Sequence, residues 1–126
     1  MNFILWTIFC LLDGIVDGFM FSKARDYMNI VVFGIDIHVF LLFRRVIVCI
    51  ALYTGLMDVL VFALVQPFLH NGSYFEIRKR MDGSYPKGFF TSRTGQGTAV
   101  INIDNFYVRL SLFIVGLILI LIPYNF

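Results

Sequence analysis

Residues 46–69 read VIVCIALYTGLMDVLVFALVQPFL, an apolar run of 24 residues in which Asp58 is the one charged side chain. A helix of about 20 residues crosses the hydrocarbon core of a bilayer, because each residue adds about 1.5 Å and the core is about 30 Å thick. Pro67 lies near the end of the run, where a proline disturbs a helix least. The run therefore predicts a transmembrane helix over residues 46–69.

The composition of the whole chain agrees with a membrane location. Of its 126 residues, 60% are hydrophobic and 14% are charged, whereas soluble domains average about 25% charged residues. A soluble globule of this size has too little interior for so much apolar surface, and disordered chains are poor in apolar residues. The net charge of +2 is too balanced for a nucleic-acid-binding face. We therefore expect an integral membrane protein that does not bind nucleic acid.

Two further apolar segments predict spans, over residues 2–21 and 106–123. The segment 30–43 is also apolar, but its 14 residues are too few to cross a bilayer comfortably. Two adjacent arginines, Arg44 and Arg45, follow this segment and mark its end. This segment predicts an interfacial or re-entrant helix.

Residues 70–105 form the one long polar stretch, which is rich in glycine and in charged side chains. We interpret it as a polar loop. The predicted fold is therefore an all-α integral membrane protein, a single membrane domain over residues 1–126 with three transmembrane helices, one interfacial helix and this loop. Four spans are the alternative, if residues 30–43 also cross.

Asp13, Asp17 and Asp58 are ionisable residues inside predicted spans. Such residues are costly in a bilayer, and they usually face the protein interior or a water-filled cavity. Asp13 and Asp17 are four residues apart and share a helix face. With three spans, Asp13 and Asp58 would lie at a similar depth, with no Lys or Arg at that depth. The three carboxylates are candidates for an ion or proton site, against the alternative of neutral groups bonded across a helix interface.

Gly14 and Gly18 form a GxxxG pattern on the helix that carries the first two aspartates. Small residues allow close helix approach in lipid, where no hydrophobic force drives helices together. We expect this face to be a packing face, either within the chain or between copies of it.

A set of His, Arg and Lys side chains flanks the predicted spans and is expected to contact lipid headgroups. Its members are His38, Arg44, Arg45, His70, Arg78, Lys79 and Arg80. No HExxH or comparable metal-binding spacing occurs, and no nucleophile elbow or phosphate-binding glycine loop is present. The sequence therefore predicts no metal, no cofactor and no catalytic residue.

Several short motifs resemble small membrane proteins of Bacteroidota and of their phages or mobile elements. They are Asp58, residues 67–72 (Pro-Phe-Leu-His-Asn-Gly), Tyr74, Arg78 and residues 82–88 (Asp-Gly-Ser-Tyr-Pro-Lys-Gly), with Asp17-Gly18, His38 and Arg45 upstream. The resemblance covers most of the chain and implies a multi-pass protein of a bacterial inner membrane or a phage-related setting. That family has no known function, so no activity or site carries over.

Three hypotheses for function follow. The first is a structural or assembly role in the membrane, as a homo-oligomer or a subunit of a membrane complex. The second is a homo-oligomeric ion or proton pore, possibly of phage type, that uses Asp13 and Asp58. The third is a membrane-embedded enzyme that acts on lipid headgroups and needs His38, Arg45 and His70 at one face. The lipid bilayer is an expected partner in all three.

Overall fold

A computed structural model of the chain describes residues 2–23, 31–32, 35–91 and 105–122. Within them, the fold is all-α, as predicted, with one antiparallel pair of two-residue strands in which Val31 lies opposite Asp36. The elements, in chain order, are α1 (Phe3–Lys23), β1 (Val31–Val32), β2 (Ile35–Asp36), α2 (Ile37–Leu52), α3 (Leu56–Met81) and α4 (Phe106–Leu121).

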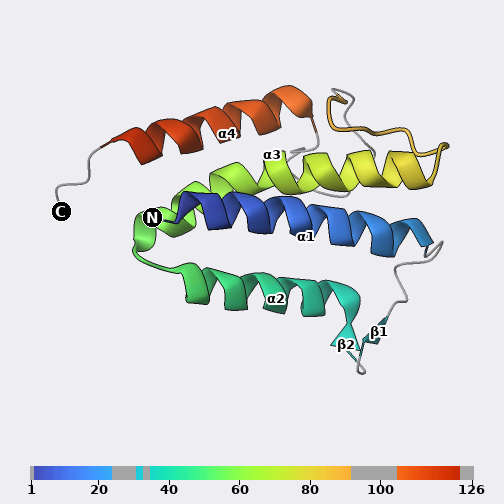
Figure 1. The fold of residues 1–126 in the computed structure, drawn as a ribbon, viewed down its shortest axis with the longest axis horizontal. Helices are drawn as coiled ribbons and strands as arrows, with labels where there is room; N and C mark the ends of the chain where they lie inside the picture. Colours follow the sequence, from blue (N-terminus) through green and yellow to red (C-terminus); the bar gives the residue numbers. More distant parts are fainter. Residues whose placement is uncertain (1, 24–30, 33–34, 92–104, 123–126) are drawn as a thin grey trace.

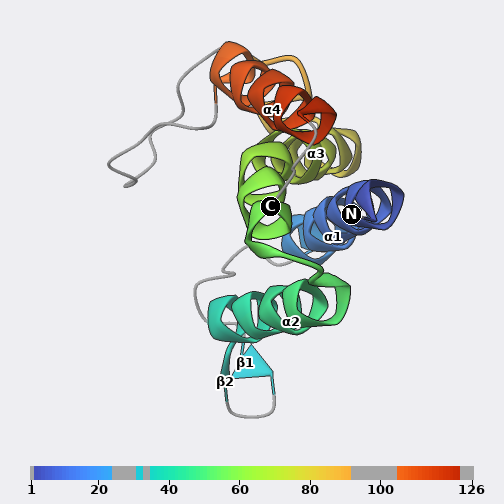
Figure 2. The same cartoon turned by 90° about the vertical axis from the view of Figure 1, so that its left-hand side faces the viewer.

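The helices lie side by side, and each runs opposite to the helix before it in the chain (Figure 1). Two perpendicular views agree on their order across the molecule, which is α4, α3, α1 and α2 (Figures 1 and 2). The first turn of α1 and the last turn of α4 lie at the same end of the bundle (Figure 1). The described part of the chain therefore contains four antiparallel helices, whereas the prediction had three spans and one interfacial helix.

The closest helix packing is between α1 and α3. Gly14 lies directly against Ser73 and the backbone of His70, and Gly18 lies against Ile77. An added Cβ on Gly18 would meet the Cβ of Ile77 at 2.9 Å, which is closer than side chains approach. The GxxxG pattern therefore lies in an interface within the chain.

The apolar core continues from this interface to α4. Its buried members are Cys10 from α1 and Val61, Val65 and Leu69 from α3. Gly116 lets α4 approach, because a Cβ there would meet the Val65 side chain at 2.8 Å. Asn105 caps the first turn of α4 by accepting a hydrogen bond from a backbone N–H of that turn, at 2.9 Å.

α2 is packed differently from the other helices. Within residues 39–52, Leu41 is the one side chain that is buried, at 3% exposure. Few backbone positions of α2 come close to α1 or α3. Most apolar side chains of α2 are exposed, and they include Val39, Leu42, Phe43, Ile47 and Ile50. Apolar packing therefore holds α2 only weakly.

The prediction of one continuous span over residues 46–69 is wrong. α2 ends at Leu52 and α3 begins at Leu56, so the run turns back on itself. The physical cause lies in the turn, where the Asp58 carboxylate accepts hydrogen bonds from the backbone N–H of Thr54, at 3.1 Å, and from its hydroxyl. Gly55 provides the extended backbone that starts α3.

The boundaries of the neighbouring segments also differ from the prediction. Residues 70–81, predicted as part of a loop, extend α3 past Pro67 to Met81. Residues 31–36 contain the two short strands, and α2 then runs through Arg44 and Arg45 rather than ending before them. The described part of the predicted loop beyond α3 is residues 82–91 and Asn105.

Among the described helices, α1 is the one that meets the usual length and hydropathy criteria for a membrane span. Its segment Phe3–Ser22 has 20 residues and a mean hydropathy of 1.8, and 33% of its most apolar window is buried. α4 is apolar over Phe106–Leu121 but shorter.

Candidate functional site

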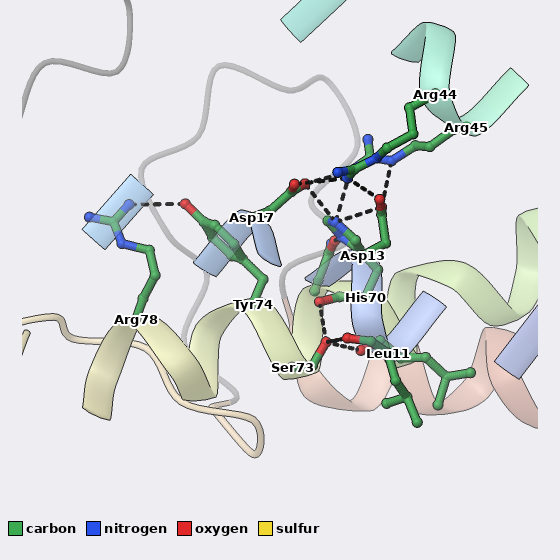
Figure 3. A network of polar contacts seen from close by, with 11 residues as sticks. Leu11, Asp13, Asp17, Arg44, Arg45, His70, Ser73, Tyr74 and Arg78 are labelled. Carbon is green, nitrogen blue, oxygen red and sulfur yellow. Dashed lines mark hydrogen bonds and ion pairs between the residues drawn. The ribbon is translucent and has the colours of Figure 1, made fainter. Parts of the chain in front are cut away.

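The candidate site is a cluster of charged side chains between α1, α2 and α3 (Figure 3). α1 contributes Asp13 and Asp17, which lie one turn apart and are 5% and 2% exposed. Gly14 and Gly18 flank these aspartates and bring the α1 backbone against α3. The same close approach therefore buries both carboxylates at the helix interface.

α2 contributes both arginines, which contact the same two carboxylates. Arg45 donates from Nε to Asp13 Oδ2 and from Nη2 to Asp17 Oδ2, each at 2.8 Å. Arg44 donates from Nη2 to Asp17 Oδ1 at 2.9 Å and also to Asp13. The expectation that no cation lies near Asp13 is therefore wrong, and the two arginines act as internal ion-pair partners.

α3 contributes His70, which is 7% exposed. Its Nε2 lies 3.0 Å from Asp17 Oδ2 and 2.8 Å from Arg45 Nη2. A neutral ring with its proton on Nδ1 accepts from Arg45, whereas a ring protonated at Nε2 donates to Asp17. Because one nitrogen cannot do both, the proton on His70 selects its partner. Asn71 Oδ1, at 2.9 Å from Nδ1, favours a proton there.

The cluster also offers a set of possible metal ligands. Asp13, Asp17 and His70 are all buried, and one ligand atom of each lies within 4.8 Å of the others. The two carboxylates, however, already face two guanidinium groups, so the cluster is neutral with a neutral histidine. A divalent cation would add two uncompensated positive charges beside Arg44 and Arg45. The charge balance therefore favours an ion-pair cluster over a metal site.

A cavity of about 250 Å³ opens beside the cluster. Polar and aromatic side chains both line it, so it can accept a ligand that carries a charged group and an apolar part. The lining residues are Asp17, Phe21, Leu41, Arg45, His70, Asn71, Tyr74 and Phe75. Tyr74 lies over one turn from His70, with the two rings parallel within 4°.

The basic residues predicted to contact headgroups divide into two groups. Arg44, Arg45 and His70 belong to the buried cluster described above. Arg78, Lys79 and Arg80 lie in the last turns of α3, where positive charge is favoured by the helix dipole. The structure describes His38 as part of α2, but its side chain lies outside the described part.

The last turns of α3 carry their own polar contacts. Arg78 donates to the Tyr74 hydroxyl at 2.9 Å, and its guanidinium lies 4.4 Å from the centre of the Tyr85 ring. Arg80 donates to Glu76 at 2.9 Å. Arg78 therefore contacts a residue that lines the cavity, which is Tyr74.

Asp58 does not join the other two aspartates. It lies in the first turn of α3, at the end of the bundle where α1 begins, and its carboxylate bonds Thr54. Asp13 lies beside His70, twelve residues further along α3. Asp13 and Asp58 therefore do not lie at a similar depth, contrary to the prediction. Asp58 instead stabilises the start of α3.

We expect Asp58→Ala to lower the free energy of unfolding by about 1 kcal/mol, because it removes a carboxylate that bonds the start of α3. Asp58→Asn keeps an acceptor for the Thr54 N–H and should retain most of that stability. Detergent-induced unfolding, followed by Trp6 fluorescence, measures both variants. Equal losses for the two substitutions would argue against the capping role.

Arg109 is a buried arginine that the sequence interpretation did not place in any site. It is 0% exposed, and its Nη2 donates to the Phe89 carbonyl oxygen at 2.7 Å. Its guanidinium lies 5.4 Å from the centre of the Phe75 ring. Arg109 thus ties the segment after α3 to α4. The sequence did contain a signal for this buried residue, which is a single arginine within an apolar helix. Such arginines rarely face lipid, so they are expected to lie in the protein interior.

No protein-family model, no curated protein and no solved structure matches the chain. The resemblance to small membrane proteins of Bacteroidota therefore remains a prediction.

Proposed function

We propose that the chain is a small polytopic membrane protein with a structural or assembly role, and that all four helices lie in the bilayer. In this proposal, the charged cluster of Asp13, Asp17, Arg44, Arg45 and His70 fastens α2 to the rest of the bundle. The protein then works as a homo-oligomer or as a subunit of a larger membrane complex.

The membrane part of this proposal is supported by the distribution of polar and apolar side chains. Asp13, Asp17 and Arg109 are buried, whereas Ile4 and Leu121 are 71% and 81% exposed. Exposed apolar side chains occur on every helix, and the outer surfaces of α1, α2 and α4 carry most of them. A soluble monomer rarely exposes apolar surface on every side, whereas lipid favours it.

The assembly part of the proposal is supported by α2. This helix buries one side chain of residues 39–52, yet two of its arginines make ion pairs with buried carboxylates. In a bilayer, lipid covers the exposed apolar side as readily as protein does, so ion pairs and hydrogen bonds decide helix association. We propose that a partner helix binds the outer side of α2, whose exposed apolar side chains no other described helix covers.

Cysteine labelling tests the four-span arrangement. Gly55 lies in the turn between α2 and α3, and Gly83 lies just beyond α3, at opposite ends of that helix. A Cβ at either position would meet nothing within 4 Å, so both substitutions should be tolerated. Gly55→Cys and Gly83→Cys would be made separately in a chain with Cys10→Ala and Cys49→Ala.

We expect a membrane-impermeant maleimide to label the two cysteines from opposite sides of sealed vesicles. The chain without cysteines is the control for background labelling. Labelling of both positions from the same side would contradict the crossing of α3. Release of the protein from membranes by alkaline carbonate would contradict the membrane location itself.

A further inference from the structure

We propose that His70 is a proton-operated switch that sets how firmly α2 is held. With a neutral ring, Nε2 accepts a hydrogen bond from Arg45 and helps to fasten α2. Protonation of Nε2 breaks that hydrogen bond and releases α2 from α1 and α3. This inference rests on the proposed fastening role of the charged cluster, and it names how that fastening is regulated.

Three atoms at the centre of the cluster make it sensitive to one proton (Figure 3). His70 Nε2 lies 2.8 Å from Arg45 Nη2 and 3.0 Å from Asp17 Oδ2. The same Arg45 nitrogen donates to the same Asp17 oxygen at 2.8 Å. Because a guanidinium nitrogen only donates, its contact with Nε2 is a hydrogen bond only while Nε2 carries no proton. After protonation, two cationic groups lie in contact and compete for one carboxylate oxygen.

The other ring nitrogen of His70 keeps its partner in both states. Asn71 Oδ1 lies 2.9 Å from Nδ1 and accepts the Nδ1 proton of the neutral ring. The charged ring retains that proton, so this hydrogen bond persists when Nε2 is protonated. The added proton therefore changes the partner of Nε2 without releasing the ring from α3.

The charged and titratable groups around His70 come from three helices. They are Asp13 and Asp17 of α1, Arg44 and Arg45 of α2, and Tyr74 of α3, whose hydroxyl accepts from Arg78. The two carboxylates balance the two arginines of α2, so a proton on His70 gives these five side chains one net positive charge. That charge lies 3.0 Å from an Asp17 oxygen and 3.3 Å from an Asp13 oxygen. Protonation therefore strengthens the pairing of α1 with α3 and repels α2.

α2 is the helix that can respond, because little apolar packing opposes its release. Leu41 is the one buried side chain within residues 39–52. α1 and α3, in contrast, pack closely through Gly14 and Gly18. Ion pairs and hydrogen bonds decide helix association in lipid, so the loss of one such bond acts mainly on α2.

The cavity beside the cluster gives water a path to His70. Its volume of about 250 Å³ far exceeds the roughly 15 Å³ that one water molecule needs. Its lining extends from His70 to Tyr74, one turn further along α3, and to Phe21, two residues before the end of α1. A proton can therefore reach Nε2 through water from the end of the bundle where α1 ends.

Distance measurements at two pH values test the switch. α2 and α4 lie at opposite outer sides of the bundle (Figures 1 and 2), so labels on these two helices report the movement of α2. Spin labels are attached to Ile47→Cys and Ile118→Cys, at positions that are 51% and 53% exposed, in a chain with Cys10→Ala and Cys49→Ala. The labelled protein is measured in a lipid nanodisc. We expect a narrow distance distribution at about pH 8 and a broad one at about pH 5, since histidine changes its charge between these values.

The chain contains two histidines, so His38 provides the matched control. His70→Gln keeps an acceptor oxygen for Arg45 but has no titrating ring, and its distribution should stay narrow at both pH values. His38→Gln should retain the pH response of the unmodified protein.

Asn71→Asp changes the pH of the response in a direction that loss of a contact does not predict. The new carboxylate lies beside Nδ1 and favours the charged ring. The midpoint of the broadening should therefore rise by about one pH unit. This variant also tests the switch if the His70→Gln chain does not fold.

A distribution that stays narrow at both pH values in the unmodified protein would overturn the switch and leave the fastening role intact. A response that persists in His70→Gln, or that is lost in a folded His38→Gln chain, would also overturn it. A midpoint that stays the same or falls in Asn71→Asp would contradict protonation of His70. A distribution that is already broad at about pH 8 would contradict the proposed function itself, because the neutral cluster would then not hold α2.

Discussion

Replacing Arg45 by alanine is expected to lower the free energy of unfolding by about 3 kcal/mol, because the loss of one partner leaves buried charge uncompensated. Arg45 bonds both Asp13 and Asp17, whose side chains are 2% and 3% exposed. Without it, the two carboxylates share Arg44 alone. The expected loss lies at the lower end for buried ion pairs, since the Arg45 side chain itself is 26% exposed.

Unfolding by sodium dodecyl sulfate, followed by the fluorescence of Trp6, measures this loss. Trp6 is the single tryptophan, is 2% exposed and packs against Phe62 of α3, so it reports on the α1–α3 core. Arg80→Ala is the matched control. Arg80 forms an exposed ion pair with Glu76, and its loss should change stability by less than about 0.5 kcal/mol. Equal losses for the two variants would mean that the cluster does not stabilise the fold.

Replacing Gly14 by alanine is also expected to cost about 3 kcal/mol, because the added methyl group meets the His70 carbonyl group and the Ser73 hydroxyl. The carbonyl belongs to the backbone of α3, so the clash cannot be relieved by a side-chain rotation. α1 and α3 would have to move apart, which would also lengthen the contacts between His70 and the two aspartates. The effect should therefore exceed the simple loss of packing.

The matched control for this variant is Gly55→Ala, since a Cβ at Gly55 meets nothing within 4 Å. We expect that control to retain the stability of the unmodified protein. The same detergent titration compares the two variants. If Gly14→Ala unfolds at the same detergent concentration as the control, the close contact between α1 and α3 is not what holds the bundle together.

The sequence was sufficient to predict the helical class and the shared face of Asp13 and Asp17, but not the separate position of Asp58. Asp13 and Asp17 share a face with Gly14 and Gly18, and this spacing already indicated that the charged side and the packing side coincide. What the spacing could not indicate is the partner of that face. The arginines that bond the aspartates lie 27 to 32 residues away in the chain, and no local pattern links them.

The interpretation of Arg44 and Arg45 as the end of an apolar segment failed for a related reason. In a span, a pair of arginines usually marks the membrane boundary. Here both lie within α2, because the buried carboxylates of α1 compensate their charge. A hydropathy pattern treats each charged side chain as unfavourable in the membrane. It does not include an ion-pair partner, which lowers the free energy needed to bury that charge.

The turn at residues 53–55 was missed because it lies inside a continuous apolar run. Gly55 and Asp58 were the only signals, and both also occur inside spans. The polar residues after Pro67 caused the opposite error, because they led to the prediction of a loop where the helix in fact continues. His70 and Ser73 were assigned to a loop, but they are buried in α3, where Ser73 bonds the carbonyl oxygen of Leu69 at 2.8 Å.

The ion pairs of Arg44 and Arg45, rather than apolar packing, are expected to hold α2 against α1 and α3. Spin labels at Ile50 of α2 and Ile4 of α1, which are 72% and 71% exposed, report the separation of these helices in a lipid nanodisc. We expect a narrow distance distribution in the otherwise unmodified protein and a broad one after Arg44→Ala and Arg45→Ala together. A distribution that stays equally narrow without both arginines would contradict the claim.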